Sequence, residues 1–267
     1  MSNLVITIMA AGEGKRMNSN IPKILHKFNS IPMLIRIIIE SYKLYPNKII
    51  IITGKYDQLI KNTINEYFSD DNQDILDNII FVKQHNPNGT GDAIKSTLEH
   101  YNEKDNVLIL NGDMPLVSYT LLKKFISSEN KDSLYSFDID SKEIAKLLVA
   151  KLDNPYGYGR ILYNNYGEFI GIKEEKDCSE QEKKIDITNV GIYFFNGKIL
   201  KKYIPLINNN NSQKEYYLTE IIKIIRQYSD INIETYQIEE ELKYQIMGVN
   251  TQEELKNLEK QYELIKL

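Results

Sequence analysis

Two hydrophobic patterns alternate along the first half of the chain. Continuous apolar runs, typical of strands buried on both faces of a parallel sheet, cover residues 4–9, 48–53, 79–83 and 106–110. Between them, apolar positions recur at helical spacing in residues 33–45, 57–68 and 92–101, with Asp92 as the expected N-cap of the last helix. This alternation predicts an α/β fold with a mostly parallel sheet and helices on both faces. Ligands of such folds bind at the carboxyl ends of the strands.

The second half of the chain changes character. It predicts short strands in residues 133–137, 145–152, 160–163, 169–173 and 190–195, with turns at 164–167 and 196–197. Helices are expected at residues 200–207, 218–227 and 252–265, and a further strand at 231–236. We expect a single domain, residues 1–267, in which a β-rich part, residues 118–250, extends the sheet of residues 1–117 and a helix, residues 251–267, follows. No internal repeat is visible.

Composition narrows the class of protein. The net charge of −4 leaves no excess of basic residues for a general nucleic-acid interface. No apolar stretch is long enough to span a bilayer, and the start of the chain does not resemble a signal peptide. The single cysteine, Cys178, suits a reducing compartment. We therefore expect a cytoplasmic protein without a membrane partner.

A glycine-rich segment follows the first predicted strand directly. Gly12 and Gly14 let the backbone approach a phosphate closely, and Arg16 adds a cationic fork that suits phosphate oxygens. Lys23 follows a proline and offers a second positive charge to the same anion. The segment lacks the Gly-Lys-Ser/Thr ending of a Walker A loop, and Met17 stands at the third glycine position of a dinucleotide fingerprint. A glycine-rich turn with solvated basic residues is the alternative.

Asp113 ends the fourth predicted strand, where a parallel sheet exposes its ligand side. A carboxylate there is a suitable hard ligand for Mg²⁺ between the phosphates of a nucleotide. The alternative is a turn residue that caps the next helix. Asn250, whose amide oxygen is also an acceptable hard ligand, has the alternative role of a helix N-cap.

The chain resembles the Rossmann-like nucleotidyltransferase family over nearly its whole length. It is most similar to the uridylyltransferase half of the bacterial bifunctional N-acetylglucosamine-1-phosphate uridylyltransferases. The motifs that carry the resemblance are the glycine-rich start with Pro22-Lys23, then Gly89-Thr90-Gly91, Gly112-Asp113-x-Pro115-Leu116, Gly157-Tyr158-Gly159-Arg160-Ile161, Glu174-x-Lys176-Asp177, Asn189-x-Gly191-Ile192, Glu215-Tyr216-Tyr217-Leu218-Thr219 and Gly248-Val249-Asn250. The resemblance implies the nucleotide-diphospho-sugar transferase fold, with a twisted sheet and a β-rich sugar-binding extension.

The resemblance also implies a reaction. UMP is transferred from UTP to N-acetylglucosamine-1-phosphate, which gives UDP-N-acetylglucosamine and pyrophosphate, with Mg²⁺ as cofactor. Implied catalytic residues are Arg16 and Lys23, and implied metal ligands are Asp113 and Asn250. Implied nucleotide-binding residues are Ala10, Ala11, Gly12, Gly14, Lys23, Gln84, Gly89, Thr90 and Gly112. Implied sugar-binding residues are Gly159, Glu174, Asn189, Tyr217 and Thr219.

Several of these residues have a structural alternative. Gly89 follows Asn88, a common turn pair, and Tyr217 is equally compatible with core packing. Glu174 lies in a charged run, so it could equally be a solvated surface residue. Hydrogen bonding by Gln84 to an imide edge would separate uracil from cytosine.

The chain departs from the family pattern in three ways. Glu13 and Lys15 place opposite charges in the phosphate loop where the family has other residues, and no acetyltransferase half follows. We therefore expect uridylyl transfer without acetyl transfer, by a monomer or small homo-oligomer. Two rivals remain: a nucleotidyltransferase for another sugar or polyol phosphate, and a non-catalytic nucleotide-binding module of this fold.

Overall fold

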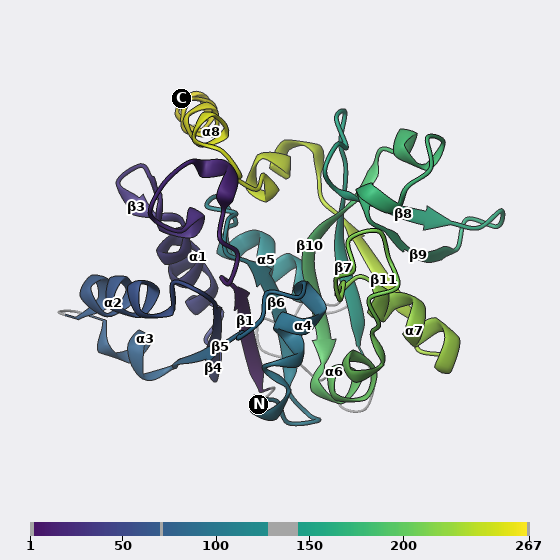
Figure 1. The fold of residues 1–267 in the computed structure, drawn as a ribbon, viewed down its shortest axis with the longest axis horizontal. Helices are drawn as coiled ribbons and strands as arrows, with labels where there is room; N and C mark the ends of the chain where they lie inside the picture. Colours follow the sequence, from purple (N-terminus) through teal and green to yellow (C-terminus); the bar gives the residue numbers. More distant parts are fainter. Residues whose placement is uncertain (1–2, 70–71, 128–143, 266–267) are drawn as a thin grey trace.

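The computed structural model describes residues 3–69, 72–127 and 144–265. A twisted sheet runs through the molecule in the order β11-β7-β10-β6-β1-β4-β5 (Figure 1). Parallel pairing joins β1 to β4 and β6, and β4 to β5, which confirms the predicted mostly parallel core. The strands of this part are β1 Leu4–Met9, β4 Lys48–Thr53, β5 Ile79–Lys83 and β6 Asn106–Asn111. A separate small hairpin pairs β2 Lys27–Phe28 with β3 Ile31–Pro32.

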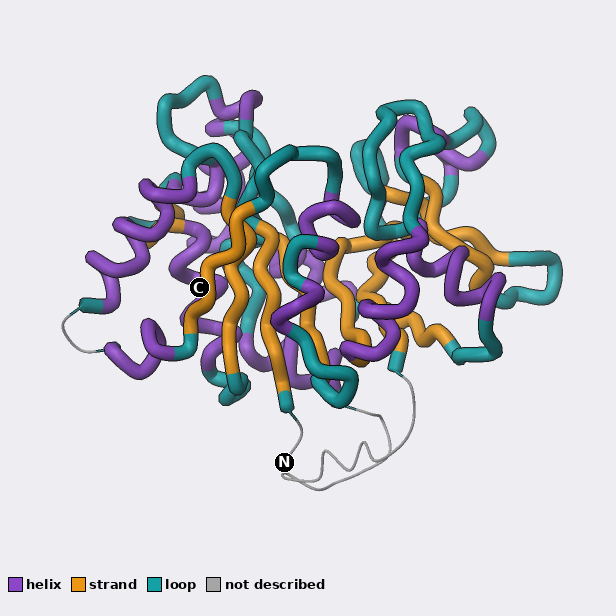
Figure 2. The backbone as a smooth tube through the Cα atoms, turned by 60° about the horizontal axis from the view of Figure 1, so that its bottom comes forward, coloured by secondary structure: helices purple, strands orange, loops and turns teal. Residues whose placement is uncertain are grey.

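Helices cover both faces of the sheet because its central strands are apolar on both sides. Ile49 and Ile51 of β4 pack into the core layer that contains α1, α2 and α5. Ile50 and Ile52 point into the opposite layer, with α4, α6 and α7. Figure 2 shows the strands as a continuous central layer with helices around it. The helices are α1 Met33–Tyr42, α2 Asp57–Phe68, α3 Gln73–Asp77, α4 Thr90–Lys95, α5 Tyr119–Ile126, α6 Gly197–Tyr203, α7 Glu220–Tyr228 and α8 Gln252–Ile265.

The start of α4 corrects one prediction. The helix begins at Thr90 with Gly89 at the N-cap, so Asp92 lies in its first turn and is not the cap. Gly89 has φ +113°, and a Cβ there would lie 2.6 Å from the Tyr216 carbonyl oxygen. The close approach of a distant loop therefore sets this helix start, and a local capping pattern cannot reveal it. The helix ends at Lys95, and a separate 3₁₀ turn follows at Leu98–His100.

The β-rich part extends the sheet as predicted. Strand β10, Ile187–Asn196, pairs antiparallel with both β6 and β7, Ala145–Lys151, and so joins the two halves. The hairpin of β8, Gly159–Tyr163, and β9, Phe169–Lys173, branches from β10, while β11, Ile233–Gln237, pairs parallel with β7. The turn predicted at 196–197 is wrong, because Asn196 ends β10 and α6 starts at Gly197. The strand predicted at 133–137 lies outside the described residues.

The last helix packs onto the glycine-rich segment. Leu255 and Leu258 of α8 share a small apolar cluster with Met17. Gln252 Nε2 donates a hydrogen bond of 2.9 Å to the Met17 carbonyl oxygen. The helix therefore fixes one end of the segment that the sequence assigns to phosphate binding.

None of the helices in the described part of the chain has the length and apolar character needed to cross a membrane.

Candidate active site

The glycine-rich segment and Asp113 lie side by side because β1 and β6 are neighbours. Met9 and Asn111, the last residues of the two strands, are paired in register. The Gly112 amide then donates to the Met9 carbonyl oxygen at 3.0 Å, so the two chains leave the sheet together. The predicted phosphate loop and the predicted metal ligand therefore meet at the carboxyl edge of the sheet.

Gly14 allows the predicted phosphate loop to pack closely against Lys23. It has φ +65°, and a Cβ at this position would lie 2.4 Å from the Lys23 Cβ. Its neighbours Glu13 and Lys15 form an ion pair of 3.9 Å, with the Lys15 side chain 84% exposed. The two unusual charges thus face each other at the surface, where such a pair contributes little to stability.

Lys23 joins the two predicted metal ligands. Its Nζ lies 2.5 Å from Asp113 Oδ2 and 2.8 Å from Asn250 Oδ1. A carboxylate oxygen and an amide oxygen from positions far apart in the chain therefore converge on one cationic centre. The same two oxygens are hard ligands of the kind that Mg²⁺ accepts, so the donor set fits the implied metal.

Asp113 and Asn250 would provide only part of the oxygen ligands that a Mg²⁺ ion needs. Within residues 3–69, 72–127 and 144–265, no three His, Cys, Asp or Glu side chains gather as a metal cage. A Mg²⁺ ion held by Asp113 and Asn250 alone needs further oxygen ligands. Nucleotide phosphates and water supply such ligands in sites that act on nucleotides.

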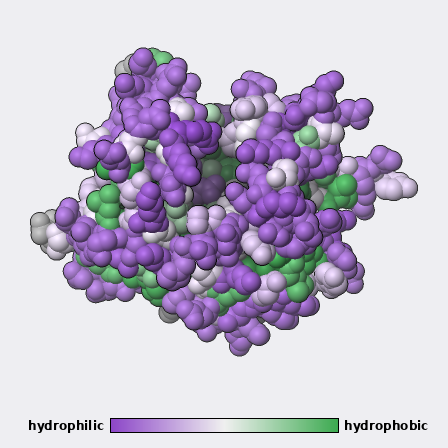
Figure 3. All heavy atoms as spheres, in the orientation of Figure 1, coloured by the Kyte–Doolittle hydropathy of each residue, from purple (hydrophilic) through white to green (hydrophobic). Residues whose placement is uncertain are grey.

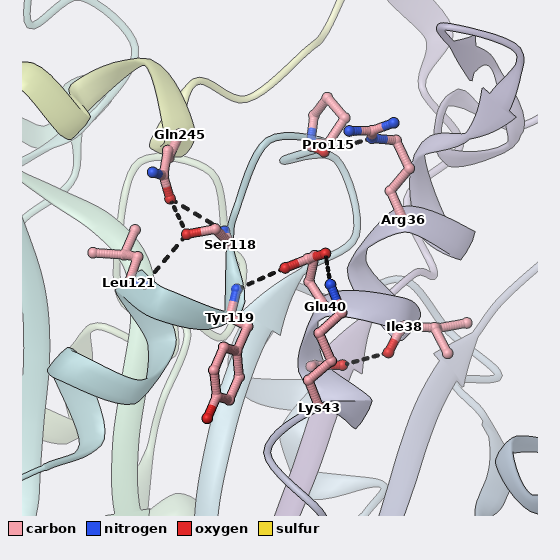
Figure 4. Close-up of polar contacts among 10 residues, drawn as sticks. Arg36, Ile38, Glu40, Lys43, Pro115, Ser118, Tyr119, Leu121 and Gln245 are labelled. Atoms are coloured by element: carbon pink, nitrogen blue, oxygen red, sulfur yellow. Dashed lines mark hydrogen bonds and ion pairs between the residues drawn. The ribbon is translucent and has the colours of Figure 1, made fainter.

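A polar network holds the segment that follows Asp113 (Figure 4). Arg36 Nε of α1 donates to the Pro115 carbonyl oxygen at 2.9 Å, and the Tyr119 amide donates to Glu40 Oε2 at 2.8 Å. Ser118 caps α5 by accepting from the Leu121 amide, and its hydroxyl donates to Gln245 Oε1 at 2.7 Å. The turn that positions Asp113 is therefore anchored to α1, to α5 and to the chain just before Asn250.

The first of two adjoining cavities has the predicted nucleotide residues in its walls. It has a volume of about 280 Å³. Its walls include Ala11, Gly12, Lys23, Gln84, Gly89, Thr90, Gly112 and Asp113. Ala10 and Gly14 are not among them: Ala10 is buried beneath the loop, and Gly14 packs behind Lys23. Their predicted contact with nucleotide stays a prediction.

The second cavity is larger, about 620 Å³, and has most of the predicted sugar residues in its walls. These are Gly159, Glu174, Asn189 and Thr219, and they are joined there by Arg16, Asp113 and Asn250. Figure 3 shows the molecule hollowed between the side that carries α1 and α2 and the side that carries β8 and β9. The side chain of Tyr217 is buried and is not part of this wall. Its role in sugar binding stays a prediction.

Polar groups in the larger cavity are already oriented. Thr219 Oγ1 donates to Glu174 Oε1 at 2.8 Å. Asn189 Nδ2 donates to the Tyr193 hydroxyl at 2.7 Å, and Asn189 Oδ1 accepts from the Gly191 amide at 3.2 Å. These bonds fix the side chains before any ligand arrives, which lowers the ordering cost of binding.

Four residues line both cavities: Met9, Thr90, Asn111 and Asp113. Asp113 thus stands where ligands of the two cavities would meet. Asn111 was not assigned a role from the sequence, although its position as the last residue of β6, beside Gly112, was a usable signal. Tyr193 was also missed, since its contact with Asn189 depends on how β10 folds.

Burial raises the pKa of the Glu174 carboxyl above its ordinary value, and nearby Asp177, Glu220 and Glu215 add to the effect. The Thr219 hydrogen bond opposes it. Between the ordinary and the raised pKa, the folded protein holds a proton that the unfolded chain has released, so this group makes stability fall as pH rises.

Glu174→Gln is therefore expected to raise the melting temperature by a few °C at pH 8. The neutral amide removes the buried charge while its oxygen can still accept from Thr219. The gain over wild type should shrink as the pH falls through the raised pKa of Glu174, because the wild-type carboxyl then gains a proton in the folded protein. Melting curves of both proteins between pH 5 and pH 8 test this, and a constant difference across that range would contradict it.

Sequence comparison supplies the family. The profile of the MobA-like NTP transferase domain matches residues 6–151, which include Lys23, Gln84 and Asp113. The chain belongs to the MobA-like NTP transferase family. The predicted nucleotidyltransferase fold and enzyme class are thereby confirmed.

Individual relatives are similar to nearly the whole chain, beyond the residues that the family profile matches. It is 40% identical over 259 residues to a protein of Acanthamoeba polyphaga mimivirus named probable UDP-N-acetylglucosamine pyrophosphorylase, with 96% of this chain and 95% of that protein covered. It is 36% identical to the bifunctional protein GlmU of Clostridioides difficile (strain 630), of which it spans 51%. The chain thus spans about half the length of its bifunctional relatives.

A solved structure supports the fold independently of sequence. A putative glucose-1-phosphate thymidylyltransferase from Bacillus anthracis superposes with a TM-score of 0.69 over 97% of this chain and 94% of that one. The sequences are only 18% identical, so this likeness concerns the fold alone.

Proposed function

We propose that the protein is a UDP-N-acetylglucosamine pyrophosphorylase, which transfers UMP from UTP to N-acetylglucosamine-1-phosphate. The observation that carries the proposal is the convergence of Lys23, Asp113 and Asn250 at the junction of two cavities. The name of the mimivirus relative, matched over nearly its full length, supports the choice of substrates. The single cysteine supports a place in the cytoplasm.

In this mechanism a phosphate oxygen of the sugar-1-phosphate attacks the α-phosphorus of UTP. A new P–O bond forms as the bond from the α-phosphorus to the bridging oxygen breaks, and pyrophosphate leaves with that electron pair. The nucleophile is already an anion, so the step requires no general base. Its obstacle is the repulsion between two anions, which positioning and positive charge reduce.

The residues divide this work between them. Lys23 and Arg16 place positive charge at the phosphates, and the glycine-rich backbone donates N–H groups to them. Asp113 and Asn250 would hold Mg²⁺, which when bound neutralises phosphate charge. Asn189, Glu174 and Thr219 bind and orient the sugar from the larger cavity.

Base choice is the first test of the substrate assignment. If Gln84 and the Gly89 backbone read the uracil edge, UTP should be used on the order of 10²-fold better than CTP, because the wrong base leaves buried polar groups unpaired. A pyrophosphate-release assay with a panel of nucleotides and N-acetylglucosamine-1-phosphate measures this ratio. Equal use of UTP and CTP would remove the uracil assignment.

The same assay with different acceptors tests the sugar assignment. We expect higher kcat/KM with N-acetylglucosamine-1-phosphate than with glucosamine-1-phosphate, since in this proposal Gly159 and Asn189 contact the acetamido group. A polyol phosphate or another sugar phosphate as the best acceptor would move the protein to a sister activity. No pyrophosphate release with any acceptor would favour a non-catalytic nucleotide-binding module.

A further inference from the structure

The side chain of Gln84 donates hydrogen bonds to two acceptors of the protein. Its Nε2 donates to the Gly89 carbonyl oxygen at 3.2 Å and to Asp92 Oδ2 at 2.9 Å. Gln84 is 7% exposed, and what it exposes lies in the wall of the smaller cavity. Both partners belong to the turn that begins α4.

The two acceptors determine the orientation of the Gln84 amide, with its nitrogen towards them and its oxygen away. Neither a carbonyl nor a carboxylate oxygen can donate a hydrogen bond, so only the NH₂ group of Gln84 can face them. A flipped amide would place Oε1 against two acceptors and lose both bonds. Oε1 is therefore the end of the amide left for a ligand, and in the described parts of the chain it accepts no hydrogen bond.

The Gly89 carbonyl oxygen also accepts from the Ala93 amide at 3.1 Å, and the backbone around it is bonded to the loop before α7. The Tyr216 amide donates to the Asn88 carbonyl oxygen at 2.7 Å, and the Gly91 amide donates to the Tyr216 carbonyl oxygen at 2.7 Å. One acceptor for Gln84 thus lies in a turn whose backbone is hydrogen-bonded to a distant loop. The other, the Asp92 carboxylate, is the only charged contact of Gln84 in the described residues.

The orientation of this amide decides which pyrimidine fits. Uracil presents an N3–H donor between two carbonyl oxygens, whereas the N3 of cytosine is an acceptor beside an amino group. An amide oxygen can accept from N3–H of uracil, and only a flipped amide could donate to N3 of cytosine. The orientation imposed on Gln84 therefore favours uracil.

We propose that Asp92 is a positioning residue that locks the Gln84 amide and so makes the nucleotide site prefer uracil to cytosine. This inference rests on the proposed function, because it deepens the base reading assigned to that site. Asp92 acts through Gln84 and lies outside the walls of both cavities.

Asp92→Asn is the informative variant, because it keeps the size of the side chain while its own amide can turn to accept or to donate. A flipped Gln84 amide then finds a hydrogen-bond donor at position 92, and the Gly89 carbonyl alone still opposes the flip. We expect the ratio of kcat/KM for UTP to that for CTP to fall by about 10-fold, with kcat on UTP within a few-fold of wild type.

Asp57→Asn is a matched control. Asp57 is likewise an acid in the first turn of a helix, α2, and its carboxylate accepts from Thr53 and Lys61. It lines neither cavity. Its replacement should leave the UTP to CTP ratio unchanged, whatever it does to stability.

Equilibrium binding of UDP and CDP, measured by calorimetry, separates this inference from the proposed function. A wild-type preference for UDP that Asp92→Asn reduces and Asp57→Asn retains supports the role of Asp92, even if no transfer to N-acetylglucosamine-1-phosphate is found. An undiminished preference in folded Asp92→Asn protein overturns the role of Asp92 and leaves the proposed function standing. A wild-type protein without any preference overturns both the role of Asp92 and the uracil assignment.

Discussion

Replacing Asp113 with asparagine is expected to lower turnover by about 10²- to 10³-fold while leaving the fold intact. The change keeps size and shape but removes the negative charge of the carboxylate whose Oδ2 lies 2.5 Å from Lys23 Nζ. In the proposed mechanism it also removes the anionic ligand that would hold Mg²⁺ against the phosphates. Losing one charge-stabilising group at a reacting centre commonly costs about 3–4 kcal/mol of transition-state stabilisation. Steady-state turnover across a Mg²⁺ titration measures the effect.

Asp105→Asn is the control for this variant. Asp105 directly precedes β6, at the end of the strand opposite to Asp113, and is 1% exposed. Its Oδ2 accepts from the Asn102 amide at 2.8 Å and lies 3.8 Å from Lys48 Nζ. This change should lower the melting temperature and spare turnover, the reverse of Asp113→Asn. Near-normal turnover of folded Asp113→Asn protein would remove the metal assignment.

Replacing Lys23 with methionine is expected to lower turnover at least as strongly as Asp113→Asn does. Unlike Asp113→Asn, which removes a proposed metal ligand, it should strengthen the binding of a divalent cation. Methionine keeps most of the side-chain length but removes the positive charge from the phosphate site. It also frees Asp113 Oδ2 and Asn250 Oδ1 from the ammonium that lies between them. Binding of Mn²⁺ to the nucleotide-free protein, followed by electron paramagnetic resonance, should therefore tighten although catalysis is lost.

Lys48→Met is the matched change at the other edge of the sheet. Lys48 also lies beside an aspartate, at 3.8 Å, but at the start of β4, far from both cavities. It should alter neither turnover nor Mn²⁺ affinity. Weaker Mn²⁺ binding in Lys23→Met than in wild type would show that Lys23 does not share the site of the cation.

The sequence predicted the strands of the first half well because their environment is uniform. Every residue from Ile49 to Ile52 is buried, so β4 appears as an uninterrupted apolar run. The end of α1 was predicted less well, since the apolar pattern continues to Tyr45 while the helix stops at Tyr42. Tyr45 adopts a left-handed conformation with φ +54°, and Pro46 follows. The spacing of hydrophobic residues does not reveal this backbone conformation.

The individual residues of the candidate site could be predicted from the sequence, but the contacts between them could not. Asp113 and Lys23 could be assigned from a strand end and from a resemblance, yet the distance between them depends on the order of β1 and β6 in the sheet. Asn250 meets Lys23 across 227 positions of sequence, and no spacing rule covers such a contact. The orientation of Gln84 likewise depends on Asp92, whose sequence position suggested only a helix cap.

We expect this chain to join UMP to N-acetylglucosamine-1-phosphate in a reaction that depends on a divalent cation. Phosphorus NMR of the purified protein with UTP, N-acetylglucosamine-1-phosphate and Mg²⁺ tests it directly. UDP-N-acetylglucosamine and pyrophosphate should appear in equal amounts, and EDTA should stop their formation. Absence of UDP-N-acetylglucosamine would rule out the proposed transfer, and its formation at the same rate in EDTA would rule out the dependence on a divalent cation.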